Sequence, residues 1–144
     1  MPILRHGTIL LVDDNPSVRL IISASLRANG FEVLAAGTAE KALAFCEGFE
    51  GPIDILLSDI GLTPPDLWAM ETGNDAIQHG VALAMRARKI RPSLKVVLFT
   101  GYSDERLKRL TGEINEFQVL RKPCELTFLI QTFRQLLEVT GSRA

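Results

Sequence analysis

The chain has 144 residues, 47% of them hydrophobic, and its 16 basic and 17 acidic residues leave a formal net charge of −1. This length and composition predict one domain over residues 1–144 with a sizeable core, and the balanced charge argues against direct binding of nucleic acid or of a membrane surface. No long apolar run or signal-peptide core is present, and two cysteines without metal-ligand spacing complete a pattern that predicts a cytoplasmic protein.

The first strand and helix are predicted at the start of the chain. Thr8–Val12 is a short apolar run of the kind found in buried parallel strands, and it ends in two aspartates. Asn15 suits the N-cap of the helix that follows, and Pro16 is tolerated at its first position. Gly30 is expected to end this helix as a left-handed cap.

A second strand and helix, and then a third strand, follow. Phe31–Ala36 predicts the second strand, and Thr38 suits the N-cap of the second helix. Ile53–Ser58 is an apolar run bounded by turn residues, which predicts a third buried strand. Asp59 comes directly after it, at the point where the chain leaves the sheet.

The segment after the third strand is unusually long. Connections between a strand and a helix normally take about 2–6 residues, whereas an inserted loop of about residues 63–79 is predicted here. It holds the only tryptophan, Trp68, which we expect to pack the loop onto the domain, with contact to a partner as the alternative. The third helix is expected to cover Val81–Ile90, and an earlier start at Asn74 or Asp75 stays open.

Two further pairs of strand and helix complete the chain. Lys95–Phe99 is a strand that ends at Thr100, and a polar helix opens near Ser103. Phe117–Leu120 predicts the fifth strand, and Glu125–Val139 carries its apolar residues on one side of the last helix. Strands that alternate with helices predict a doubly wound α/β fold, with a parallel sheet between two layers of helices and a core over about residues 7–140.

Polar residues of particular types stand at four of the five strand ends. They are Asp13 with Asp14, then Asp59, Thr100 and Lys122. The carboxyl ends of parallel strands meet at one edge of a sheet, so we expect these side chains to lie close together. Three neighbouring carboxylates repel one another, and such hard oxygen ligands without Cys or His favour Mg²⁺. A carboxylate nucleophile, a cation, a lysine and a hydroxyl together fit phosphoryl transfer.

Four motifs resemble those of a known family, and they stand in its order along the chain. The motifs are Ile-Leu-Leu-Val-Asp-Asp-Asn-Pro, Leu-Leu-Ser-Asp-Ile-Gly-Leu, Val-Leu-Phe-Thr-Gly-Tyr-Ser and Leu-Arg-Lys-Pro. They resemble the receiver domain of two-component response regulators, and the third motif resembles the receivers of hybrid histidine kinases. The resemblance implies a flavodoxin-like fold with strand order 2-1-3-4-5.

The resemblance also implies a role for each site residue. Asp59 would accept a phosphoryl group from phosphohistidine. Asp14, Asp59 and the backbone carbonyl of Gly61 would hold Mg²⁺ directly, with Asp13 acting largely through water. Two further residues would contact the phosphoryl oxygens, namely Lys122 and Thr100.

The same resemblance implies a signalling switch and not a turnover enzyme. The phosphoryl donor would be a histidine kinase or a histidine phosphotransfer protein. The output would be conformational change read by a downstream protein, or onward phosphotransfer. The face of the fourth helix, fifth strand and fifth helix is where such domains form homodimers.

The chain departs from the receiver pattern at two places. The loop after the phosphoacceptor gains about a dozen residues, and His79-Gly80 stands where Asp-Gly is usual. Val119 occupies a position, three before the lysine, that is often aromatic and moves with the threonine. Tyr102 is a candidate to replace that aromatic residue or to cover the site.

Two other classes of protein share parts of this pattern. A phosphatase of the haloacid-dehalogenase type also uses a strand-end aspartate and Mg²⁺, but it needs two aspartates separated by one residue, whereas Asp13 and Asp14 are adjacent. A degenerate receiver that binds partners without phosphate is disfavoured because every acid, Thr and Lys position is filled. The inserted loop keeps this second alternative open.

Overall fold

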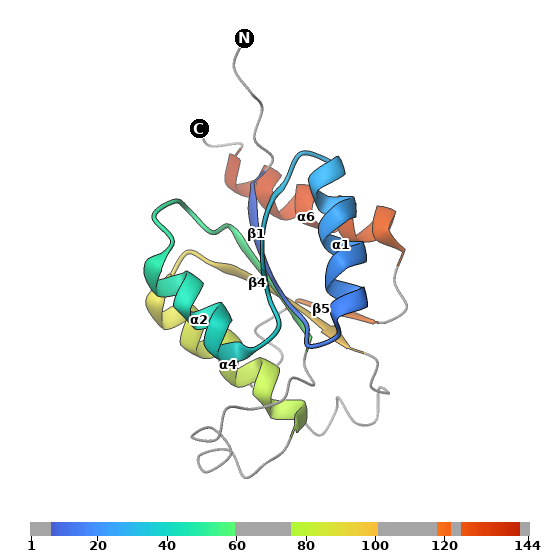
Figure 1. Ribbon diagram of the computed structural model, residues 1–144. Coiled ribbons are helices and arrows are strands. Elements are labelled where there is room, and N and C mark those ends of the chain that lie inside the picture. The colour runs from blue at the N-terminus through green and yellow to red at the C-terminus, as the bar shows by residue number, and fades with distance from the viewer. Residues whose placement is uncertain (1–6, 60–75, 101–117, 122–124, 142–144) are drawn as a thin grey trace.

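The computed structural model describes residues 7–59, 76–100, 118–121 and 125–141. Over these ranges the chain alternates between strands and helices, with the element labels of Figure 1. The elements are β1 (Thr8–Val12), α1 (Pro16–Ala28), β2 (Glu32–Ala36), α2 (Ala39–Gly48), β3 (Ile55–Asp59), α4 (Ala76–Ile90), β4 (Lys95–Thr100), β5 (Gln118–Arg121) and α6 (Leu126–Gly141).

The five strands form one parallel sheet in the order β2-β1-β3-β4-β5. This confirms the predicted flavodoxin-like strand order. Helices α1 and α6 lie on one face of the sheet, and α2 and α4 lie on the other (Figure 1). The carboxyl ends of all five strands therefore meet at one edge of the sheet.

Each strand contributes to both halves of the core. In β1, Leu10 and Val12 pack toward α2 and α4, whereas Ile9 and Leu11 pack toward α1 and α6. Successive side chains of a strand point to opposite faces, and both faces of this sheet are covered, so the strands read as continuous apolar runs. Cys46 of α2 lies in the half of the core between the sheet and helices α2 and α4, as expected for a buried thiol. Cys124 lies outside the described residues.

The helix starts follow the predicted caps. The side chain of Asn15 accepts hydrogen bonds from the backbone of Ser17 and Val18, at 2.9 and 3.2 Å, and Pro16 is the first residue of α1. Thr38 caps α2 through a bond from the backbone N–H of Lys41 at 3.1 Å. The first of these caps matters most for the site, because Asn15 directly follows the two aspartates that come after β1.

Several boundaries differ from the predicted ones. β2 begins at Glu32, because the backbone N–H of Phe31 bonds to the carbonyl of Leu26 at the end of α1. β3 begins at Ile55, so the buried Ile53 precedes it. The first hydrogen bonds to the neighbouring strands are made by Asp54, whose N–H donates to the carbonyl of Thr8 and whose carbonyl accepts from the N–H of Lys95.

The last two strands also extend further than predicted, since β4 includes Thr100 and β5 runs over Gln118–Arg121. The third helix takes the earlier start and begins at Ala76, so that the end of the predicted inserted loop is helical. The rest of that loop, Trp68 and the polar helix near Ser103 lie outside the described residues. No helix in the described part of the chain has the length and apolar character needed to cross a membrane.

Candidate functional site

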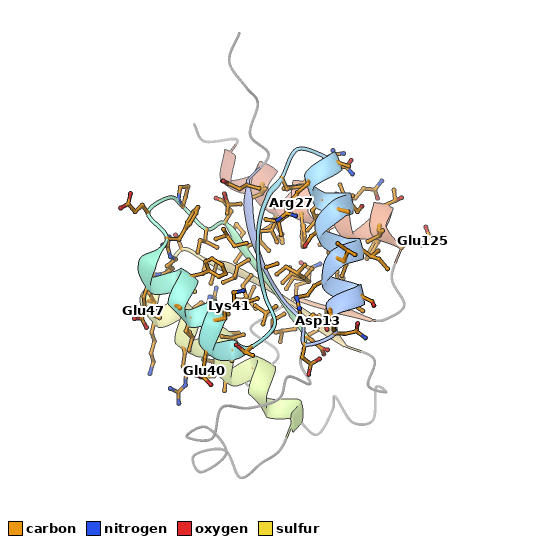
Figure 2. The ribbon with its side chains drawn as sticks, viewed as in Figure 1. Asp13, Arg27, Glu40, Lys41, Glu47 and Glu125 are labelled. Carbon is orange, nitrogen blue, oxygen red and sulfur yellow. The ribbon has the colours of Figure 1, made fainter. Side chains whose placement is uncertain are left out.

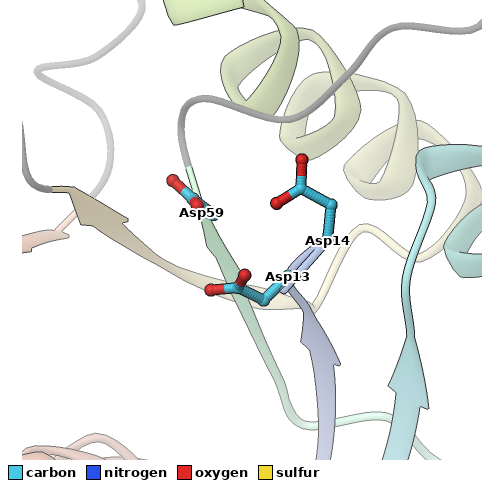
Figure 3. A group of neighbouring side chains, drawn as sticks. All are labelled: Asp13, Asp14 and Asp59. Carbon is cyan, nitrogen blue, oxygen red and sulfur yellow. The ribbon is translucent and has the colours of Figure 1, made fainter. Parts of the chain in front are cut away.

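Three aspartates gather at the carboxyl edge of the sheet. Asp13 and Asp14 follow β1, Asp59 ends β3, and one carboxylate oxygen from each lies within 4.8 Å of the others. Figure 3 shows the three side chains around a common space beyond the strand ends. β1 and β3 are neighbours in the sheet, with Val12 aligned to Ser58, and this register brings the two strand ends together.

Asp13 is held from several directions. Its side chain is only 3% exposed, and its Oδ1 accepts a hydrogen bond from the backbone N–H of Asn15 at 2.9 Å. Its own N–H donates to the carbonyl of Ala36 at 3.2 Å, and its carbonyl accepts from Nη1 of Arg19 at 2.8 Å. Asp13 therefore also organises the turn between β1 and α1.

The other two aspartates are more accessible than Asp13. Asp14 is exposed and Asp59 is half-buried. Asp59 is the last residue of β3, where it is aligned with Phe99 of β4. The buried Ser58 donates its hydroxyl to the carbonyl of Asp59 at 3.0 Å, which fixes the chain at this strand end.

The structure tests the remaining predicted site residues only in part. Thr100 ends β4 at the same edge, aligned with Arg121 of β5, so its backbone lies where the sequence places it. Gly61 and Lys122 lie outside the described residues, and their assigned roles stay predictions. Val119 lies in β5, aligned with Leu98, and is half-buried.

The donor set at this edge fits a hard divalent cation. The described residues that gather here offer carboxylate oxygens, with no cysteine or histidine among them. Mg²⁺ prefers oxygen ligands and is commonly held by one or two carboxylates, and water supplies the other positions. Asp14 and Asp59 are the more accessible carboxylates of the three, while Asp13 accepts a hydrogen bond from the backbone N–H of Asn15.

One residue near the site was missed by the sequence analysis. Arg19 lies in the second turn of α1 and reaches back to the carbonyl of Asp13. The signal was an arginine six positions after the first aspartate, on the helix that Asn15 caps. Helical geometry turns such a side chain back toward the start of its helix, and this could have identified it.

The comparisons with known proteins point to one family. A family model of the response regulator receiver domain matches residues 9–134. The sensor kinase CckA of Brucella abortus is 29% identical over 132 residues, which cover 92% of this chain and 13% of the kinase. The transcriptional regulatory protein AruR of Pseudomonas aeruginosa is 31% identical over 133 residues, covering 90% of this chain and 48% of AruR.

The relatives differ in how much of their length the chain spans. It spans less than half of CckA and of AruR. The response regulator receiver protein CpdR of Brucella abortus is matched over 95% of its own length, at 27% identity over 129 residues and 90% of this chain.

Solved structures of receiver domains share the fold. A CheY-like receiver domain protein from Methanospirillum hungatei has a TM-score of 0.74 at 26% identity, covering 96% of this chain and 98% of that one. The receiver domain of the hybrid histidine kinase CckA has a TM-score of 0.68 at 30% identity, with 91% and 99% covered.

Proposed function

The chain belongs to the response regulator receiver domain family, and from this premise we propose that Asp59 is its phosphoacceptor. The observation that carries the proposal is the group of three carboxylates, whose oxygens lie within 4.8 Å at the ends of β1 and β3. The phosphoryl donor would be a phosphohistidine on a histidine kinase or a histidine phosphotransfer protein. The chain would act as a switch in the cytoplasm and would not turn over a separate substrate.

The environments of the three aspartates favour Asp59 as the nucleophile. Asp13 is buried and one of its oxygens already accepts from the N–H of Asn15, so it is poorly placed to attack phosphorus. Asp14 lies on the turn that leads into α1. Asp59 is half-buried at the end of a central strand, and its carboxylate lies beside those of Asp13 and Asp14 (Figure 3).

The proposed step is a simple displacement. A carboxylate oxygen of Asp59 forms a bond to phosphorus while the bond between phosphorus and the partner's imidazole nitrogen breaks, and the imidazole leaves. Asp14, Asp59 and the carbonyl of Gly61 would hold Mg²⁺, which would supply positive charge to neutralise the phosphoryl oxygens. Lys122 and Thr100 would contact the same oxygens from the ends of β5 and β4. The Thr100 hydroxyl would bond to the phosphoryl group in one conformation only, which would shift the population toward that conformation.

The surface next to the site supports a helical phosphodonor. Leu20 and Ile21, two consecutive large apolar residues of α1, are 72% and 58% exposed. Because α1 begins two residues after Asp14, a partner helix lying on this surface would bring its histidine near Asp59. The expected homodimer would use the predicted helix near Ser103, the fifth strand and the last helix. Of these three elements the structure describes β5 and α6.

Intact mass after treatment with acetyl phosphate tests the phosphoacceptor. We expect the gain of one labile phosphoryl group with Mg²⁺ present and none after chelation. Steady release of product from p-nitrophenyl phosphate, without a stable phosphorylated chain, would instead indicate a phosphatase. A chain that gains no phosphoryl group under either condition would be the degenerate receiver.

A substitution in α1 tests the donor surface. Leu20→Glu should reduce phosphotransfer from a histidine kinase or phosphotransfer protein at least about tenfold, since a charge replaces an apolar side chain that the partner would cover. Phosphorylation by acetyl phosphate should stay unchanged. Phe128→Glu in α6 is the matched control, because Phe128 is similarly exposed, at 52%, but lies on another helix. Equal losses in the two variants would contradict the assignment.

A further inference from the structure

Arg19 connects three elements beside the aspartates. It projects from α1 to the end of β1, where Nη1 donates to the carbonyl of Asp13 at 2.8 Å. Its guanidinium also lies against Gly37, just after β2: a Cβ built on that glycine would stand 2.8 Å from Nη1 and 3.2 Å from Cζ. Asp13 is joined to the same place through its N–H, which donates to Ala36.

Gly37 leaves room for the guanidinium of Arg19. A real Cβ essentially never comes within 3.0 Å of another heavy atom, so any larger residue at position 37 would displace the guanidinium. The three heavy atoms nearest to this Cβ position all belong to Arg19. Because the guanidinium is the far end of a flexible side chain, an alanine at position 37 would move it away at little cost to the fold.

The bond from Nη1 goes to a backbone carbonyl and not to a carboxylate. An arginine that paired with the carboxylates would compete with a cation for their oxygens. By holding the carbonyl of Asp13, Arg19 instead fixes the direction in which the chain turns from β1 toward Asp14. Residues that orient metal ligands in this way typically change metal affinity about 10- to 100-fold when mutated.

We propose that Arg19, which packs against Gly37, is a positioning residue that holds the Asp13–Asp14 turn in the geometry that binds the divalent cation. The inference rests on the proposed cation site and adds a residue to it. A positioning role and a purely electrostatic role of Arg19 predict opposite changes in Mg²⁺ affinity when the arginine is removed. Removing a positive charge near a cation site should tighten Mg²⁺ binding by Coulomb's law, whereas losing the positioning contact should weaken it.

The test is the Mg²⁺ dissociation constant, measured by calorimetry or by amide shifts with Mg²⁺ alone. Arg19→Gln should weaken binding about tenfold although it removes a positive charge. Arg19→Lys, which keeps the charge and one donor, should recover part of the loss. Urea unfolding of each variant checks that the fold is retained, and the lysine variant serves as the test if the glutamine variant unfolds.

Arg27→Gln is the matched control. Arg27 lies on the same helix and also donates to a backbone carbonyl, that of Val33, at 3.2 Å. Figure 2 shows Arg27 near the end of α1 opposite to Asp13. It lies eight positions after Arg19, which corresponds to about 12 Å along the helix. Its loss should leave Mg²⁺ binding unchanged. Equal losses in the two glutamine variants, or unchanged or tighter binding in Arg19→Gln, would overturn the proposal.

Gly37→Ala tests the contact between Gly37 and the Arg19 guanidinium without removing a charge. It should weaken Mg²⁺ binding as Arg19→Gln does, and it should add little in the double variant, since both changes break one contact. Fully additive losses would show that Gly37 acts independently of Arg19. If the wild-type chain binds Mg²⁺ but gains no phosphoryl group, the phosphoacceptor assignment fails while Arg19 is still judged on Mg²⁺ affinity; a wild type that binds no Mg²⁺ overturns both.

Discussion

The two edges of the sheet handle charge in opposite ways. At the carboxyl edge, three carboxylates of like sign gather within 4.8 Å. At the opposite edge, the guanidinium of Arg91 donates to three backbone carbonyls, those of Cys46, Phe49 and Gly51. The arginine meets three acceptors within the chain, whereas the aspartates bring like charges together in an arrangement compatible with Mg²⁺.

The edge with Arg91 also joins distant parts of the chain. The carbonyls that it contacts lie 40 to 45 residues earlier, at the end of α2 and in the loop before β3. Nearby, Asp54 accepts from the N–H of Thr8 through Oδ2 at 2.8 Å. This edge therefore contributes to stability, and the following predictions test whether function and stability separate between the two edges.

The largest expected effect is at the carboxyl edge. Asp59→Asn should abolish labile phosphorylation by acetyl phosphate, because the nucleophile is lost. It should leave the free energy of unfolding equal or higher, since one of three repelling charges is removed. Intact mass and urea unfolding measure the two outcomes. Persistent labelling of the variant, or a clear loss of stability, would break the separation.

The next largest effect is at the other edge. Arg91→Ala should lower the free energy of unfolding by about 2 kcal/mol, since it leaves three carbonyls without this donor. Mg²⁺ affinity and the phosphorylation rate should stay at wild-type values. Lys89→Ala is the control, because Lys89 is an exposed cation near the end of α4. A change in Mg²⁺ affinity in Arg91→Ala that its control lacks would show that the edges are coupled.

A smaller effect is expected in α1. The hydroxyl of Ser23 is buried and is the one such side-chain atom without a hydrogen-bond partner among the described residues. Ser23→Ala should therefore raise the free energy of unfolding by about 1 kcal/mol and leave phosphorylation unchanged. Thermal unfolding measures this, and Ser25→Ala on the same helix is the comparison. Destabilisation in Ser23→Ala alone would indicate that the hydroxyl has a partner in solution.

The smallest effect concerns pH. Burial raises the pKa of the Cys46 thiol above its ordinary value of 9.0, the nearby Arg91 guanidinium opposes this shift, and Glu47 adds to it. The native thiol thus keeps its proton where the unfolded chain loses it, so its stabilising contribution is complete below about pH 9 and is lost as pH rises further. The difference in unfolding free energy between wild type and Cys46→Ala should shrink above that pH. A constant difference up to about pH 10.5 would contradict this.

The sequence predicted the carboxyl edge better than the opposite edge. Short apolar runs mark the strands, and parallel strands share an edge, so the grouping of Asp13, Asp14 and Asp59 follows from local pattern alone. The contacts of Arg91 depend on residues far away in the chain, and no local pattern encodes them. Likewise β2 starts one residue late because Phe31 bonds to the end of α1 instead of joining the sheet.

The most direct measurement of the central claim is the position of the phosphoryl group. The chain is treated with acetyl phosphate and Mg²⁺, the acyl phosphate is reduced with borohydride, and the modified residue is identified by tandem mass spectrometry. We expect modification at Asp59 alone, dependent on Mg²⁺. Modification at Asp13 or Asp14 in place of Asp59, or modification that is independent of Mg²⁺, would contradict it.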